Sequence, residues 1–335
     1  MFESRDPAAA RIEPFPRLLA DIGGTNARFA WQDSLQSAVG RVQVLACAEH
    51  DSLKDAVERY LQHQGLAVPP CAAFGIACPV TGDAITMTNH HWRFSVGELR
   101  VALGLGRLLF VNDFTALALA LPTLPSSVLH PVGCGVADPT APVGLIGPGT
   151  GLGVSGLLPG GRASVWTPIS GEGGHVTLPA TTADEFAVIA LLQKRYGHVS
   201  AERVLCGAGL VDLYHALSDL GGDRGHEIAT PAQVLARADD RTDPIASQTL
   251  EMFCAFLGSV AGNLALTLGA RGGIYIGGGI VPRLGEDFER SAFRERFEQK
   301  GRYRAYLQRI PTLVIRSTVS PALEGASRAL SMSES

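Results

Sequence analysis

The chain has 335 residues, of which 46% are hydrophobic and 18% are charged, and its formal net charge is −4. This length and apolar content suffice for one large buried core or two ordinary ones, and the length favours two domains. Because the arginines and lysines are dispersed and the balance is slightly acidic, no basic patch points to a nucleic-acid partner.

The first residues and the cysteines indicate the compartment. Residues 1–16 are charged and contain no apolar segment, so we expect a flexible arm rather than a signal peptide. No window approaches the run of about 20 apolar residues that a membrane span requires, so we expect no membrane partner. The six cysteines form no Cys-x-x-Cys pair, and we expect reduced, mostly buried thiols in a cytoplasmic protein.

The first part of the chain has the pattern of an α/β domain that begins with a hairpin meander. We expect helices near 52–63, 95–103 and 114–121. We expect strands at 17–22, 28–32, 42–48, 72–78, 84–88 and 108–112.

The second part has more helices but the same α/β style. Residues 122–142 are rich in proline and small polar residues and predict a surface loop after the first helix of the second domain. We therefore expect the linker between the domains just before that helix, near Asn112. Strands are expected near 143–147, 152–158, 273–277 and 312–316. Helices are expected near 183–196, 209–218, 231–238, 245–269, 287–299 and 321–330.

Two strand pairs are joined by short turns of glycine and threonine, within residues 18–30 and 143–154. Glycine permits left-handed backbone angles and close approach to an anion, and successive N–H groups with a Thr hydroxyl suit a phosphate chain. Either turn alone could be a simple tight hairpin, but two matched turns indicate a nucleotide held between two domains. The residues expected to contact the nucleotide at these turns are Asp21, Gly23, Gly24, Thr25, Asn26, Gly149, Thr150 and Gly151.

Asp21 ends the first strand of one turn, beside the expected phosphates, where a carboxylate without a metal would repel them. It is therefore expected to hold Mg²⁺, directly or through a water. A P-loop is absent, because none of the three lysines follows a glycine. Residues 151–156 match the dinucleotide pattern Gly-x-Gly-x-x-Gly, but no helix is expected to follow, so we interpret that match as accidental.

Two further segments follow buried strands. Asn112 and Asp113 stand at the carboxyl end of the strand 108–112, where α/β folds bind ligands, and Asp113 is the candidate catalytic base. The alternative is that Asp113 only caps the next helix. Gly277, Gly278 and Gly279 follow the strand residues 273–276 and could let adenosine lie against bare backbone, or could form only a tight turn at the end of the strand.

Several motifs occur in one order along the chain and together resemble bacterial glucokinases. They are Asp21-Ile-Gly-Gly-Thr-Asn-Ala-Arg28, Met87-Thr-Asn-His90, Asn112-Asp-Phe-Thr-Ala116, Gly149-Thr-Gly-Leu-Gly153, Glu172-Gly-Gly-His175, Ser200-Ala-Glu-Arg-Val-Leu205 and Gly277-Gly-Gly-Ile-Val-Pro-Arg283. Cys206-Gly-Ala-Gly209 stands where the family often has Ser-Gly-Pro-Gly, and Pro321-Ala-Leu-Glu-Gly325 replaces a more apolar closing segment.

The resemblance implies a two-domain actin-like ATPase (ribonuclease H-like) fold, with a cleft between a small and a large α/β domain. It implies an arm at 1–16, a small domain of 17–112 plus 318–335 and a large domain of 113–317, with the last helix packing back on the first domain. It further implies ATP-dependent phosphorylation of D-glucose at its 6-hydroxyl by a homodimer. The implied sugar contacts are Asn89, Asn112, Asp113, Glu172, His175 and Glu202.

Some alternatives stay open. Related sugar kinases carry a Cys-rich zinc motif after Gly-Gly-His, but residues 176–179 here are Val-Thr-Leu-Pro, so no structural zinc is expected. Glu202 could be only a first-turn carboxylate favoured by the helix dipole. The acceptor could be another hexose or an amino sugar, the donor could be polyphosphate, and the protein could be a non-catalytic sugar-sensing regulator of the same fold.

Overall fold

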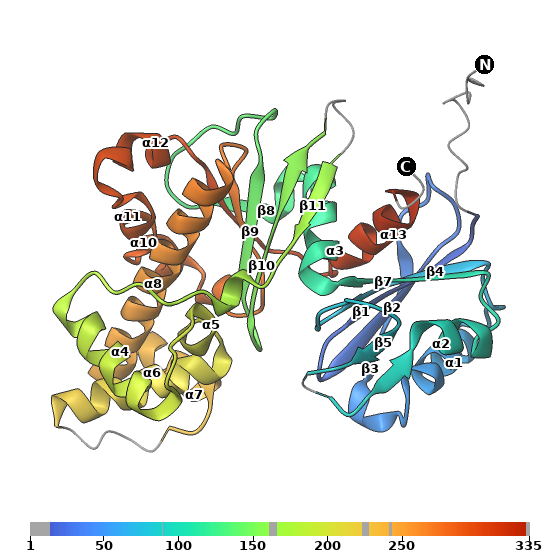
Figure 1. Cartoon of the computed structure of the whole chain (residues 1–335), viewed down its shortest axis with the longest axis horizontal. Coiled ribbons are helices and arrows are strands. Elements are labelled where there is room, and N and C mark those ends of the chain that lie inside the picture. Colours follow the sequence, from blue (N-terminus) through green and yellow to red (C-terminus); the bar gives the residue numbers. More distant parts are fainter. Residues whose placement is uncertain (1–13, 89, 161–165, 223–227, 241–242, 333–335) are drawn as a thin grey trace. The chain divides into compact units, whose positions relative to one another are not determined.

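The computed structural model describes residues 14–88, 90–160, 166–222, 228–240 and 243–332 (Figure 1). The chain divides into two compact units: the described residues up to Leu124 together with those from Ser317 onward, and Pro125–Arg316. The first unit therefore includes residues 113–124, which the expected linker near Asn112 assigned to the second domain. Most of the expected arm, residues 1–13, lies outside the described residues.

The first unit is built on a five-stranded sheet of order β3-β2-β1-β4-β7. Strands β1, β4 and β7 run parallel to one another, and β2 pairs antiparallel with both of its neighbours, β1 and β3. The strands of this sheet are β1 (Arg17–Ile22), β2 (Asn26–Gln32), β3 (Gly40–Ala46), β4 (Cys71–Ile76) and β7 (Arg107–Asn112). A separate pair is β5 (Ala84–Thr86) with β6 (Arg93–Ser95). The helices are α1 (Leu53–Gln64), α2 (Val96–Ala102), α3 (Asp113–Ala120) and α13 (Ala322–Met332), with short 3-10 turns at η1 (Cys47–Glu49) and η2 (Leu121–Thr123).

Helices cover both faces of this sheet, with α3 and α13 on one side and α1 and α2 on the other (Figure 1). Successive side chains of a strand point to opposite faces. Leu18 and Ala20 of β1 accordingly join the core that contains α1, whereas Leu19 packs with Leu323 and Leu330 of α13. This double coverage explains why the successive residues Leu18, Leu19 and Ala20 of β1 are all apolar.

The second unit contains a six-stranded sheet of order β11-β10-β9-β12-β13-β8. Its strands are β8 (Leu129–Pro131), β9 (Val143–Pro148), β10 (Leu152–Pro159), β11 (Trp166–Ser170), β12 (Ile274–Ile276) and β13 (Thr312–Ile315). Its helices are α4 (Ala183–Tyr196), α5 (Ala201–Val204), α6 (Gly207–Gly221), α7 (Pro231–Asp239), α8 (Pro244–Leu268), α9 (Val281–Leu284), α10 (Glu286–Arg290), α11 (Phe293–Glu298) and α12 (Arg304–Gln308). Short 3-10 turns are η3 (Ser126–Val128), η4 (Gly173–His175) and η5 (Gly301–Tyr303).

Helix α8 forms the centre of the second core. By length and composition it could cross a membrane, which corrects the expectation that no segment approaches that length. Of its most apolar window, 72% is buried inside the unit, as in the core helix of a globular protein. Its residues Phe253, Phe256 and Leu257 are fully buried.

An ion pair is buried beside this helix. Arg296 of α11 donates to both carboxylate oxygens of Glu185 in α4 and, at 2.9 Å, to the Ser259 hydroxyl of α8. Burial raises the pKa of Glu185, but the hydrogen bonds from Arg296 and Thr181 outweigh it and hold that pKa below its ordinary value.

The expected elements are present, with local differences. The loop expected over 122–142 contains β8, which pairs antiparallel with β13. The helix expected over 287–299 is broken into α10 and α11 at Ser291, whose hydroxyl donates to the Phe288 carbonyl. Strands β6 and β11 were not expected from the pattern. Of the six cysteines, five are buried and Cys134 is exposed, and all are free thiols.

Candidate functional site

The carboxyl ends of three parallel strands meet at one edge of the first sheet. Ile22 of β1 lies opposite Ile76 of β4, and Ile76 lies opposite Asn112 of β7. The end of β1, next to Asp21, and the start of α3 at Asp113 are therefore two strand spacings apart, or about 10 Å. This edge holds the first set of candidate residues.

Gly75 allows α3 to begin close to the sheet. A Cβ at this position would lie 3.3 Å from the Cβ of Ala116, 3.6 Å from the Ala20 carbonyl oxygen and 3.6 Å from the Cα of Asp113. The sequence pattern did not single out Gly75, because its role depends on a helix that packs against it from elsewhere in the chain.

Asn112, not Asp113, caps α3. The Asn112 Oδ1 accepts from the N–H groups of Phe114 at 3.0 Å and Thr115 at 3.2 Å, which leaves its Nδ2 as a donor. Asp113 is the first residue of the helix, and its Oδ1 accepts from the Phe114 N–H at 2.9 Å. The capping alternative for Asp113 is therefore wrong, and the cap belongs to its neighbour.

Asp21 accepts a hydrogen bond from a residue at the other end of the chain. The Ser320 hydroxyl donates to Asp21 Oδ2 at 2.7 Å, and Arg28 Nη1 lies 3.6 Å from the same oxygen. Both contacts hold the carboxylate at the end of β1. Sequence offered no signal for Ser320, which is separated from Asp21 by 299 positions.

The first glycine turn is braced by Cys47. The Gly23 N–H donates to the Asn26 carbonyl at 2.9 Å. The Cys47 N–H donates to the Thr25 carbonyl at 2.9 Å, and the Cys47 thiol donates to the Gly23 carbonyl. Thr25 is exposed at the tip. Gly23, Gly149 and Gly151 do not adopt a left-handed φ, so the left-handed backbone expected at these turns is wrong for those three glycines.

The second glycine turn lies in the second unit and contacts two other glycine segments. The Gly207 N–H, at the start of α6, donates to the Gly149 carbonyl at 2.9 Å. The Ile280 N–H donates to the Pro148 carbonyl, and a Cβ on Gly278, where φ is +78°, would lie 2.2 Å from that oxygen. The turn and the segment 277–279 therefore pack backbone against backbone, and Thr150 is exposed beside them.

Glu202 joins this turn to the expected sugar residues. Its Oε2 accepts from the Leu152 N–H at 2.9 Å, and its Oε1 lies 3.8 Å from His175 Nε2. His175 ends η4, its N–H donates to the Glu172 carbonyl, and its side chain is 59% exposed. A role for Glu202 only as a first-turn carboxylate favoured by the helix dipole does not explain this contact, because the carboxylate accepts a hydrogen bond from a residue 50 positions away.

Some expectations fall elsewhere. Asn89 lies outside the described residues. Among the residues that the structure describes, no cluster of three or more His, Cys, Asp or Glu side chains could hold a metal ion.

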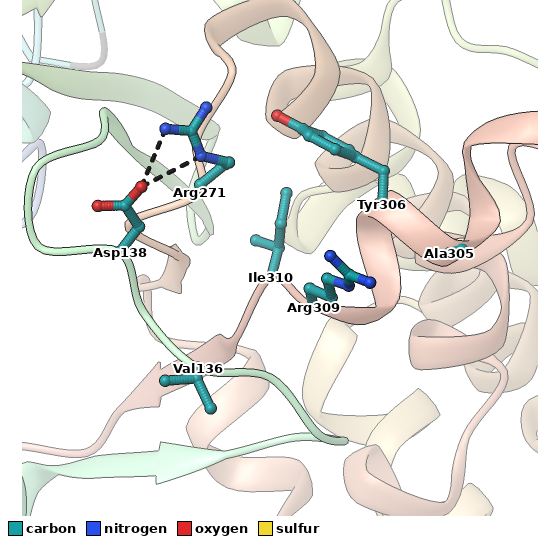
Figure 2. A pocket seen from close by; sticks show the side chains of 7 residues that line it. All are labelled: Val136, Asp138, Arg271, Ala305, Tyr306, Arg309 and Ile310. Carbon is teal, nitrogen blue, oxygen red and sulfur yellow. Dashed lines mark hydrogen bonds and ion pairs between the residues drawn. The ribbon is translucent and has the colours of Figure 1, made fainter.

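A hollow of about 450 Å³ in the second unit, where Asp138 pairs with Arg271 opposite Tyr306 and Arg309, contains none of the predicted site residues (Figure 2).

The chain matches the family model of glucokinase over residues 18–333. It is 53% identical to a glucokinase of Aromatoleum aromaticum over 95% of both chains. It is 51% identical to a glucokinase of Chromobacterium violaceum, over 93% of this chain and 88% of the other.

Solved structures agree in fold. A glucokinase from an Antarctic psychrotroph superposes with a TM-score of 0.83 at 35% identity, covering 95% of this chain and 99% of that one. A ROK family glucokinase from Streptomyces griseus, solved with glucose and AMPPNP, has a TM-score of 0.64 at 18% identity. The match covers 94% of this chain and 99% of that one. The expected actin-like ATPase fold is confirmed, and the chain belongs to the glucokinase family.

Proposed function

We propose that this protein transfers the γ-phosphoryl group of ATP to the 6-hydroxyl of D-glucose in line, with Asp113 as the general base. The observation that carries the proposal is the placement of Asp113 as the first residue of α3, beside Asn112 at the carboxyl edge of the first sheet. Phosphoryl transfer requires little covalent chemistry from the protein, so positioning and charge stabilisation dominate.

Asp113 would orient the attacking hydroxyl and accept its proton late in the reaction. An aspartate of ordinary pKa is a weak base toward an alcohol, so orientation in a loose transition state accounts for most of its effect. The Phe114 N–H fixes one carboxylate oxygen, which limits the rotation of the group.

The sugar hydroxyls act as both donors and acceptors, and the candidate residues offer both kinds of partner. Asn112 would donate through Nδ2, because its Oδ1 is used by the helix cap. Glu172, His175, Glu202 and Asn89 are proposed as further contacts to the sugar hydroxyls.

The two glycine turns would hold the phosphates, with Gly277–Gly279 against the adenosine. The chain has three lysines: Lys54 bonds Glu58, Lys300 bonds Ser259 and Asn263, and Lys194 lies in the last turn of α4. Charge stabilisation would therefore come from oriented N–H groups and the metal ion.

Asp21 is suited to Mg²⁺ through a water. Mg²⁺ is usually held by one or two carboxylates, several waters and substrate phosphates, and Asp21 supplies one partly buried carboxylate beside a phosphate turn. When bound, the ion would neutralise charge on the phosphates. A cytoplasmic homodimer is the state that the family resemblance supports, and light scattering tests the oligomer.

Asp113→Asn tests the base. We expect the turnover rate with MgATP and glucose to fall by about 10²–10⁴-fold, with glucose binding retained. The amide keeps the shape, but with its oxygen on the Phe114 N–H it presents an NH₂ donor, which can neither orient the attacking hydroxyl as an acceptor nor take its proton. Asp138→Asn, in the hollow of Figure 2, is the matched control and should keep the rate.

A retained rate in Asp113→Asn would contradict the role of the base. Mannose, fructose and N-acetylglucosamine, assayed beside glucose, identify the acceptor. Sugar binding without turnover on any of them would instead favour the regulator.

A further inference from the structure

We infer that the Glu202 carboxylate links the sugar site to the second glycine turn, so that the residue at position 151 controls sugar affinity although it belongs to the nucleotide turn. This inference rests on the proposed contact of Glu202 and His175 with the sugar.

The two oxygens of Glu202 have different partners. Oε2 accepts from the Leu152 N–H at 2.9 Å, at the first residue of β10 and directly after the turn. Oε1 faces His175 at 3.8 Å, where the imidazole is largely exposed. A sugar that bonds Oε1 therefore bonds a group whose position is set by the backbone of the turn.

The space around the turn is asymmetric. A Cβ on Gly151 would lie 2.5 Å from Glu202 Oε2 and 3.3 Å from its Cδ. A Cβ on Gly149 would meet nothing closer than the Gly279 N at 3.9 Å. Gly151 can therefore be replaced only if the carboxylate moves, whereas Gly149 has room.

The atom displaced by a residue at 151 is the end of a flexible side chain, not backbone. The fold can accommodate the change, but Glu202 would lose the Leu152 N–H and its orientation toward His175. Because such coupling is reciprocal in free energy, a sugar that orders Glu202 would also order the turn.

The test is glucose binding by calorimetry without nucleotide, on the full chain. We expect Gly151→Ala to weaken glucose binding at least about tenfold, the scale of a lost hydrogen bond to a charged group. Gly149→Ala, in the same turn, should change it less than about twofold.

A double-mutant cycle with Glu202→Gln separates this coupling from a general structural effect. Glu202→Gln alone should weaken glucose binding, and adding Gly151→Ala to it should weaken binding little further. Equal effects of Gly149→Ala and Gly151→Ala, or fully additive effects in the double variant, would overturn the inference, and so would a Gly151→Ala protein that loses only ATP affinity. If the unaltered protein bound no glucose, the proposed function would fail, which is a distinct result.

Discussion

Glu202 and Asn112 each use one side-chain oxygen to accept hydrogen bonds from backbone N–H groups. The sequence around each residue was ambiguous for a physical reason. Residues 200–203 fit a helix start as well as a ligand, and Asn112 and Asp113 are both good caps. Candidate site residues could thus be predicted from the chain, but their hydrogen-bond partners depend on contacts across many positions.

The buried pair of Glu185 and Arg296 gives a prediction at this scale. Arg296→Met should lower the free energy of unfolding at pH 7 by about 3–5 kcal/mol, because it leaves a buried carboxylate without its cation. Arg290→Met, which breaks the exposed pair with Glu286, should have little effect. Urea unfolding checks both variants, and equal losses would contradict the role assigned to burial.

The pair also predicts a pH dependence. The pKa of Glu185 is lowered in the folded protein, so the unfolded chain binds the proton more tightly. The stabilisation is complete above the ordinary Glu pKa of about 4.3 and is lost as the pH falls through the lowered value. In Arg296→Met this acid-dependent loss should shrink, and the gap to the unaltered protein should narrow below about pH 4.

At the scale of elements, strands and helices with a strong local period could be predicted closely, and those defined by partners could not. β1 and α4 match their expected bounds. β11 is half-exposed and is defined by its antiparallel register with β10. The break between α10 and α11 interrupts an apolar pattern that continues through it, because a serine side chain ends the first helix.

The contact of α3 with α13 depends on Gly325. A Cβ there would lie 1.6 Å from the carbonyl oxygen of Ala116, a backbone atom that cannot yield as a side chain does. Gly325→Ala should destabilise the protein by about 1–3 kcal/mol despite the better helix propensity of alanine.

Gly221→Ala is the matched helical control, because a Cβ at Gly221 meets nothing within 4 Å. Its stability should be unchanged or slightly higher. Thermal unfolding measures both variants, and a Gly325→Ala protein as stable as the unaltered chain would show that the two helices can separate without cost.

At the scale of the whole molecule, the first unit is assembled from both ends of the chain, whereas the second is continuous. The buried Arg17 of β1 donates to the Ser327 carbonyl at 2.9 Å and to its hydroxyl at 2.8 Å. The return of the last helix to the first sheet was expected only from the family resemblance. Local periodicity indicates that α13 is a helix but not which surface covers it.

Removing residues after Arg316 should therefore unfold one unit selectively. Without α13, the face of the first sheet that carries Leu19 and Ala73 is uncovered, so the amides of β1 and β4 should exchange hydrogen much faster. Those of α8 should stay protected, because the core around α8 is made of second-unit residues. A chain ending at Met332 is the control, and unchanged protection in β1 would refute the prediction.

The discontinuous first unit also constrains how the protein is made. A ribosome releases β1 and β4 early, yet the helix that covers Leu19 and Ala73 is translated only after the whole second unit. At about 5–20 residues per second, the second unit, Pro125–Arg316, takes on the order of 10–40 s to emerge in between. The unit that is begun first is thus the last to be finished, and its uncovered apolar face is exposed to chaperones during that interval.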